Sequence, residues 1–406
     1  MSRLFEFFKT TPTLPVAGAL GGIYLAYYLL NVVKKPLIAC SDQKFKDFLY
    51  KHCPILREKF WPTVWCFDPR LQTILRYVIQ APPKMDAYRS ELIKTWDDGE
   101  IKLDWQDSVN SPIPSEVRPT VLILPGLTGS SNDAYIKHMA HDAETLGYRS
   151  VVFNNRGNGG SKLLTPRTYC AANTEDLAFV VDHIKSNYPE APVMGVGISL
   201  GGMILFNYIS SMGPNCKLVA AMCISVSWNV FESTLSLEKP INYFLFNKML
   251  ARLLTSAVHR NIHLYEDHYD MNHVLKSATI REFDHRFTHK LFGYDSLEHY
   301  YTEASLHKKI HTLKIPVLCL SAADDPFAPY HSIPLKDVDE NGNIAIIVTS
   351  HGGHIGFMEG LFPRHKNYMY RLFQQFTAAV FTHRITDAVL GGAADCTDEQ
   401  TSMPAS

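Results

Sequence analysis

Residues 197–201 read GISLG and have the pattern G-x-S-x-G. An apolar, strand-like run (PVMGVGI) leads into this pattern, and a helix-like run (LGGMILF) leads out of it. A strand that turns this sharply into a helix needs glycines beside the turn, because larger side chains would collide there. The pattern therefore predicts a nucleophile elbow, with Ser199 as the nucleophile and Gly197 and Gly201 at the turn. The alternative is an ordinary glycine-rich turn with a capping serine.

Strand-like and helix-like runs alternate along most of the chain after residue 91. Continuous apolar runs such as TVLIL at 120–124 fit strands that are buried on both faces of a parallel sheet. The alternation predicts an α/β fold with a mostly parallel central sheet and flanking helices. Residues 229–312 interrupt it with a mostly helical period, which predicts a helical cap inserted between two strands. The other expected elements are a hairpin at 90–108, strands at 148–155, 192–198, 218–227, 315–322 and 343–350, and helices at 133–146, 174–187, 200–211, 330–338 and 364–382.

A serine nucleophile needs a general base, and the base needs an acid to orient it. In sheets that carry this elbow, the acid and then the histidine follow the serine along the chain. Asp324 and Asp325 follow the expected strand 315–322, with only Ala323 between them and the strand. Either carboxylate could serve, and we prefer Asp325 because Pro326 and Phe327 fix the loop that follows it.

The base is expected after the last strand, where the sequence reads His351-Gly352-Gly353-His354. The two glycines permit a loop that approaches the end of the sheet closely. His354 is the preferred base because it lies deeper in this loop, and His351 is the alternative. Together with Ser199 and Asp325, His354 would complete a catalytic triad.

The oxyanion of a tetrahedral intermediate needs two preset hydrogen-bond donors. The backbone N–H of Leu200, directly after the nucleophile, is one candidate. The turn after the first parallel strand supplies the other, because Gly126 lets the main chain approach the site and Leu127 then offers its N–H.

The N-terminal segment contains nineteen consecutive uncharged residues, 15–33, followed by Lys34 and Lys35. In a helix this run spans about 28 Å, close to the hydrocarbon thickness of a bilayer. We therefore expect residues 1–35 to form one transmembrane helix that anchors the protein. A cleaved signal peptide and a buried helix are the alternatives.

The rest of the chain divides into three parts. Residues 36–90 are rich in Lys, Pro and aromatic side chains and are expected to form an arm that packs on the main domain. Residues 91–385 carry the alternating pattern and the cap. Residues 386–406 are small and polar, which predicts a disordered tail.

Charge and composition exclude several functions. A formal net charge of −1 leaves no basic field for nucleic acid. The histidines of the cap lack the spacing of a metal site, so no metal is expected. The glycine cluster at 156–160 lacks the P-loop Lys-Ser/Thr, which argues against nucleotide binding, and no cofactor is expected.

Several motifs resemble the α/β-hydrolase domain-containing membrane lipases, which form a subfamily that includes the medium-chain phosphatidylcholine phospholipase and its close paralogues. The resemblance runs from the N-terminal segment to about residue 385. One departure is Ser161-Lys162 after the NNRG-G pattern. The motifs are LPGLTGSS at 124–131, FNNRGNGGSKLLTPRTYCAANTEDL at 153–177, GVGISLGGM at 195–203, LSAADDPF at 320–327 and HGGHIGF at 351–357.

This resemblance implies an α/β-hydrolase fold and the triad Ser199, Asp325 and His354. It also implies a single-pass, type II-like signal-anchor protein of the endoplasmic reticulum or another endomembrane. The implied reaction is phospholipase A1/A2-type hydrolysis of phospholipid esters, with phosphatidylcholine as the expected substrate and the bilayer as a partner. A neutral-lipid esterase or a thioesterase with the same triad is the alternative, followed by a non-catalytic membrane scaffold.

Overall fold

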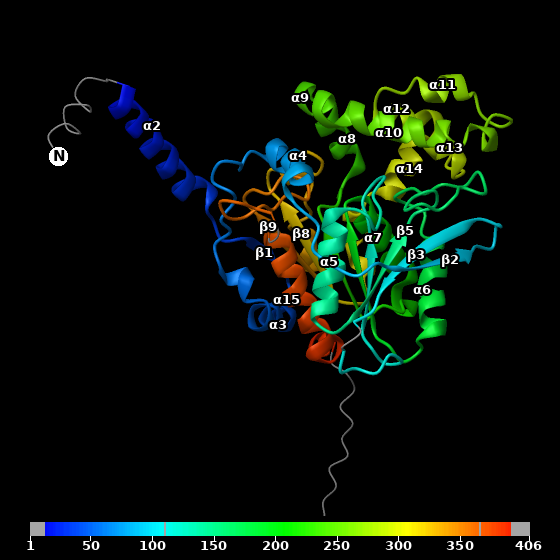
Figure 1. The fold of residues 1–406 in the computed structure, drawn as a ribbon, viewed down its shortest axis with the longest axis horizontal. Coiled ribbons are helices and arrows are strands. Elements are labelled where there is room, and N and C mark those ends of the chain that lie inside the picture. The colour runs from blue at the N-terminus through cyan, green and yellow to red at the C-terminus, as the bar shows by residue number, and fades with distance from the viewer. Residues whose placement is uncertain (1–12, 109–110, 365–366, 391–406) are drawn as a thin grey trace, which may run out of the picture.

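A twisted mixed sheet forms the centre of the chain, whose structure is a computed structural model that describes residues 13–108, 111–364 and 367–390 (Figure 1). Within these residues the sheet has nine strands in the order β1-β9-β8-β7-β6-β4-β5-β3-β2. The strands from β4 to β9 run parallel, and β1, β3 and β2 are antiparallel to their neighbours. The strands are β1 (Leu37–Ala39), β2 (Arg89–Lys94), β3 (Glu100–Gln106), β4 (Thr120–Leu124), β5 (Arg149–Asn154), β6 (Val193–Ile198), β7 (Ala220–Ile224), β8 (Val317–Ala322) and β9 (Ile344–Thr349).

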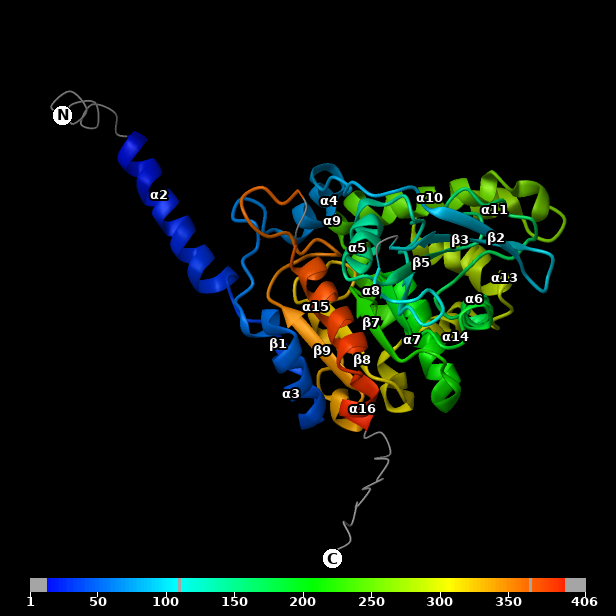
Figure 2. The ribbon, with the colours of Figure 1, turned by 60° about the horizontal axis from the view of Figure 1, so that its bottom comes forward.

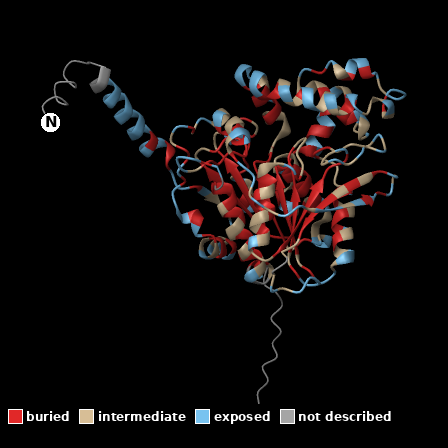
Figure 3. Cartoon of the chain, in the orientation of Figure 1, coloured by how far each residue is buried: buried red, intermediate tan, exposed pale blue. Residues whose placement is uncertain are grey.

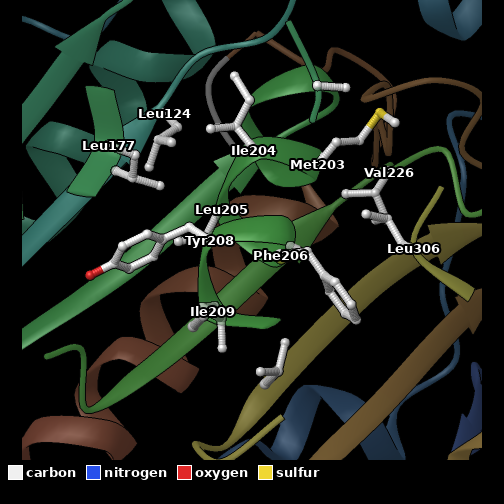
Figure 4. Close-up of a cluster of buried hydrophobic side chains, with 14 of the residues drawn as sticks. Leu124, Leu177, Met203, Ile204, Leu205, Phe206, Tyr208, Ile209, Val226 and Leu306 are labelled. Atoms are coloured by element: carbon white, nitrogen blue, oxygen red, sulfur yellow. The ribbon is translucent and has the colours of Figure 1, made fainter. Parts of the chain in front are cut away.

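Helices cover both faces of the sheet, so the predicted α/β-hydrolase architecture is confirmed. One face packs on α6 (Glu175–Asn187) and α7 (Leu200–Met212), and Figure 4 shows the apolar side chains that surround α7. The other face packs on α3 (Gln43–His52), α5 (Ala134–Thr145) and α15 (Tyr368–Thr382). Buried residues fill both layers (Figure 3). Burial on both faces explains why the central strands are continuously apolar.

Residues 36–90 are part of the domain rather than an arm laid on its surface. β1 extends the sheet by pairing with β9, and Phe45 and Leu49 of α3 lie in the core. α4 (Pro69–Ile79) reaches the end of the sheet where the candidate site lies. The aromatic side chains that suggested an arm contribute to this packing, as when Phe60 meets Tyr368 edge-on.

At the N-terminus, α2 (Thr13–Tyr27) continues into a π-helical turn, Tyr28–Val32. The side chains described on α2 are exposed and apolar (Figure 3). The turn is fixed to the domain, because Tyr28 donates a hydrogen bond to the Pro62 carbonyl. In the described part of the chain, no single helix has both the length and the apolarity needed to traverse a bilayer.

The cap lies between β7 and β8, above the ends of the central strands (Figures 1 and 2). Helices joined by turns form the cap, with π-helical turns at Tyr243–Asn247 and Asp284–Thr288. Its helices are α8 (Val230–Glu238), α9 (Pro240–Asn242), α10 (Lys248–His259), α11 (Met271–Leu275), α12 (Ile280–Phe283), α13 (His289–Leu291) and α14 (Leu297–Ala304).

Two local predictions need correction. The expected helix at 330–338 is instead two short 3₁₀ turns, Tyr330–Ser332 and Asp337–Glu340, because Pro334 interrupts the segment. Helix α16 occupies Ile385–Leu390, where the disordered tail 386–406 was expected to begin. The other residues of that tail lie outside the described part of the chain.

Candidate active site

Ser199 stands at the turn from β6 into α7, with φ 54° and ψ −119°. A positive φ is costly for a residue with a Cβ, so the surroundings must hold it in place. The flanking glycines allow the turn to close. A Cβ on Gly197 would lie 2.5 Å from the Gly201 carbonyl oxygen, and a Cβ on Gly201 would lie 2.3 Å from the Leu124 carbonyl oxygen. The serine side chain therefore projects from a tightly packed elbow.

His354 lies against this serine, although the two residues are 155 positions apart in the chain. Its Nε2 atom is 2.8 Å from Ser199 Oγ. Its Nδ1 atom is 2.9 Å from Asp325 Oδ2 and 3.2 Å from Asp325 Oδ1. A proton on Nδ1 satisfies the carboxylate and leaves Nε2 free to accept the serine proton. The structure thus brings together the three residues that the sequence proposed as a triad.

Asp325 is buried and held by its own loop. Its Oδ1 atom accepts hydrogen bonds from the backbone N–H groups of Phe327 at 2.7 Å and Ala328 at 3.3 Å. The Phe327 ring also stacks on the imidazole of His354, with ring centroids 4.0 Å apart. This loop therefore fixes both the acid and one face of the base.

The alternative residues have other contacts. Asp324 accepts a hydrogen bond from the Gly353 N–H at 2.9 Å, and burial raises the pKa of its carboxyl to about 7. His351 packs edge-on against Phe67, with ring centroids 5.9 Å apart. Neither residue contacts the serine hydroxyl.

Two further side chains hold the histidine loop, and sequence reasoning missed both. The Thr73 hydroxyl of α4 accepts a hydrogen bond from the His354 N–H at 2.9 Å. The Ser225 hydroxyl, just after β7, accepts one from the Ile355 N–H at 3.2 Å. Ser225 follows a strand beside the nucleophile strand, a position that could have drawn attention to it. Thr73 gives no such signal, because only the fold brings α4 to this loop.

The expected oxyanion donors flank the serine. A Cβ on Gly126 would lie 3.4 Å from Ser199 Cβ, so the turn after β4 runs directly beside the nucleophile. The Gly126 N–H donates to the Tyr135 hydroxyl at 3.0 Å, which fixes this turn. Leu127 and Leu200 both line the cavity above the serine. Among the described residues, neither of their N–H groups has a hydrogen-bond acceptor.

A cavity of about 600 Å³ opens above Ser199 and His354, between α4, α7 and the cap. Its wall is largely apolar and includes Ile74, Met203, Leu237, Phe246 and Leu250.

Polar side chains interrupt the apolar lining, among them the carboxyl groups of Asp133 and Asp284. Asp284, from the cap, is buried and accepts a hydrogen bond from the Tyr301 hydroxyl at 3.2 Å. Burial raises the pKa of this carboxyl to about 7. The cavity therefore combines a largely apolar surface with a few polar side chains, and the Asp284 carboxyl lies on its cap side.

A parallel sheet with a strained serine at its centre, a histidine on that serine and an aspartate on the histidine defines the class of serine hydrolases. The chain belongs to the α/β-hydrolase fold family, whose model matches residues 119–361. It is similar to Phospholipase ABHD3 of Bos taurus and of Homo sapiens, each 50% identical over 362 residues, which cover 89% of this chain and 88% of the relative. Protein abhd-3.2 of Caenorhabditis elegans is 34% identical over 339 residues, 83% of this chain and 89% of that protein. These relatives confirm the resemblance seen in the sequence.

Proposed function

We propose that this protein hydrolyses fatty-acyl ester bonds of phospholipids, with phosphatidylcholine as the substrate, through an acyl-enzyme on Ser199. The observation that carries the proposal is the 2.8 Å contact between Ser199 Oγ and His354 Nε2 beneath an apolar cavity. The relatives at 50% identity, which are named phospholipases, support the choice of substrate.

In the first step, His354 Nε2 takes the proton of the Ser199 hydroxyl while Oγ attacks the ester carbonyl. The N–H groups of Leu127 and Leu200 stabilise the resulting oxyanion. When the tetrahedral intermediate collapses, the C–O bond to the glycerol breaks, and His354 gives its proton to the departing lysophospholipid oxygen. The acyl chain remains on Oγ as an ester.

In the second step, His354 removes a proton from a water molecule, and the hydroxide attacks the acyl ester. Collapse of this intermediate releases the fatty acid and returns the proton to Ser199 Oγ through His354. The Asp325 carboxylate stabilises the imidazolium that forms twice in the cycle.

The cavity supports a lipid acyl chain as the group that is bound. Each methylene that leaves water for an apolar wall contributes about 0.8 kcal/mol, so an apolar cavity of this size favours a hydrocarbon chain over a small polar ester. Neutral lipids and acyl thioesters have the same chain, and they are therefore the alternative substrates that the experiment must separate.

The experiment compares lipid turnover by the wild type, Ser199→Ala and Ser211→Ala, where Ser211 is an exposed serine on the same helix, α7. Each protein is given phosphatidylcholine, monoacylglycerol and an acyl thioester, and released fatty acid is measured by mass spectrometry. We expect phosphatidylcholine to be cleaved best by the wild type and by Ser211→Ala, and not by Ser199→Ala. A fluorophosphonate probe should label the same two active proteins. Preferential cleavage of either other substrate would overturn the choice of phospholipid. Labelling of Ser199→Ala by the probe would show that Ser199 is not the nucleophile.

The proposal includes the single-pass, type II-like anchor at the endoplasmic reticulum or another endomembrane. The exposed apolar side chains of α2, among them Leu20, Ile23 and Leu25, support it, because such side chains are more stable in a hydrocarbon layer than in water. Extraction of cell membranes with alkaline carbonate tests it: the full-length chain should stay with the membrane pellet. Release into the supernatant would contradict an anchor.

A further inference from the structure

Exposed apolar side chains surround the mouth of the cavity. Tyr77 and Val78 of α4 line the cavity and are nevertheless 66% and 78% exposed. Facing them across the mouth, the cap exposes further large apolar side chains. We call this set the mouth patch; it consists of Leu71, Tyr77, Val78, Ile241, Phe244, Leu245, Met249 and Leu253.

The surface helix α6 does not share this character. On α6, the exposed side chains are Glu175, Asp182, Ser186 and Asn187, all of them polar. On the cap, Ile241 and Phe244 are 58% and 71% exposed. An apolar patch that is continuous with a cavity mouth indicates a surface that is covered by something else.

Cations predominate in the two segments that carry the mouth patch, and the carboxylates of Asp68 and Glu238 lie at the ends of these segments. Residues 239–265 contain Lys239, Lys248, Arg252 and Arg260 and no aspartate or glutamate. Residues 69–85 of α4 and the loop after it contain no acidic residue, and their cations are Arg70, Lys84 and the buried Arg76. Apolar side chains with an excess of cations around them match a phospholipid surface that carries anionic headgroups.

The N-terminal helix lies on the same side of the molecule. In Figures 1 and 2, α2 rises away from the sheet towards the side where α4 and α9 lie. A bilayer that held α2 would therefore face the mouth patch.

We propose that the mouth patch docks on a phospholipid bilayer, inserting Ile241 and Phe244 among the acyl chains and placing the cap cations against headgroup phosphates. The cavity then opens directly into the membrane, so an acyl chain can reach Ser199 without crossing water. This inference rests on the proposed function for the identity of the substrate. It adds a second membrane contact, separate from α2, that orients the catalytic domain.

The first test uses the full-length protein with Ile241→Glu and Phe244→Glu combined, since neither residue lines the cavity. Leu92→Glu is the matched control, because Leu92 is 60% exposed on the edge strand β2. We expect hydrolysis of phosphatidylcholine vesicles that contain phosphatidylserine to fall about tenfold or more in the double variant. Hydrolysis of the soluble ester p-nitrophenyl butyrate should be unchanged in both proteins. Vesicle hydrolysis at the wild-type rate in the double variant would overturn the proposal.

The second test measures contact with lipid by fluorescence and does not depend on catalysis. Phe244→Trp and Leu92→Trp are each reconstituted in vesicles with brominated acyl chains. The fluorescence of the new tryptophan is obtained by subtracting the fluorescence of the parent protein, measured in the same vesicles. Quenching of the Phe244→Trp signal alone supports docking. Equal or absent quenching in both proteins overturns it, as does burial of residue 244 in a dimer or in another protein. If the wild type cleaves the soluble ester but no phospholipid, the proposed substrate is wrong. The quenching measurement still tests whether the mouth patch docks on a bilayer.

Discussion

Thr73 and His354, 281 positions apart, are joined by a hydrogen bond of 2.9 Å from the His354 backbone N–H to the Thr73 hydroxyl oxygen. The same hydroxyl donates to the Pro69 carbonyl at 2.7 Å, so its position on α4 is fixed. A helix encoded before the parallel strands of the sheet thus holds the loop that carries the base.

Thr73→Val should slow catalysis through this contact. Valine has nearly the shape of threonine but no acceptor, and the His354 N–H would be left buried and unpaired, at a cost of about 1–3 kcal/mol. We expect kcat on a soluble ester to fall about tenfold. Thr73→Ser, which keeps the hydroxyl, should restore most of the rate. Equal loss in both variants would mean that the methyl group, and not the hydrogen bond, matters.

Asp325→Asn and Asp324→Asn should differ strongly. At position 325 an amide cannot stabilise the imidazolium or fix its tautomer, and we expect kcat to fall by about 10⁴-fold. At position 324 the amide oxygen can still accept from the Gly353 N–H, so most activity should remain. Steady-state kinetics on both variants gives the comparison. A larger loss of kcat in Asp324→Asn than in Asp325→Asn would mean that Asp324 is the acid of the triad.

Ser199→Gly should be more stable than Ser199→Ala. Both variants lack the nucleophile, but only glycine removes the Cβ that makes a φ of 54° costly. Relief of this strain should raise the free energy of unfolding by about 1 kcal/mol relative to alanine. Denaturant unfolding of the two inactive proteins measures the difference. Equal stability would show that the elbow carries no strain at Ser199.

Asp284 should make stability depend on pH. Burial raises the pKa of its carboxyl from 3.8 to about 7, so the folded protein retains this proton in a range where the unfolded chain has lost it. The stabilising contribution is therefore complete below about pH 4 and is lost as the pH rises to about 7. Asp284→Asn has no such proton, so its stability relative to the wild type should increase across this window and stay level above it. Thermal unfolding of the two proteins at a series of pH values tests this. A constant difference would contradict the shifted pKa.

The sequence allowed the central fold and the triad to be predicted because both depend on local patterns. Apolar runs mark strands that are buried on both faces, and Ser199, Asp325 and His354 each follow such a strand. The carboxyl ends of parallel strands meet at one edge of the sheet, so their order along the chain was enough to bring these residues together.

Contacts made across the fold could not be predicted in this way. β1 has three residues, too few for a periodic signal, and it is a strand only because β9 offers it a free edge. Thr73 looks like any other helical threonine until α4 packs beside the histidine loop. The π-helical turns of the cap, such as Tyr243–Asn247, likewise depend on packing rather than on a residue pattern.

The cap leaves the sheet after β7 and returns at β8, and these two strands are neighbours. About half of the residues that line the cavity above the nucleophile are therefore encoded by one uninterrupted stretch of sequence whose two ends lie side by side. Such an insertion can change in sequence and length while the sheet and the catalytic triad beneath it stay in place. Chain-length preference can thus diverge among related proteins without any change in their chemistry.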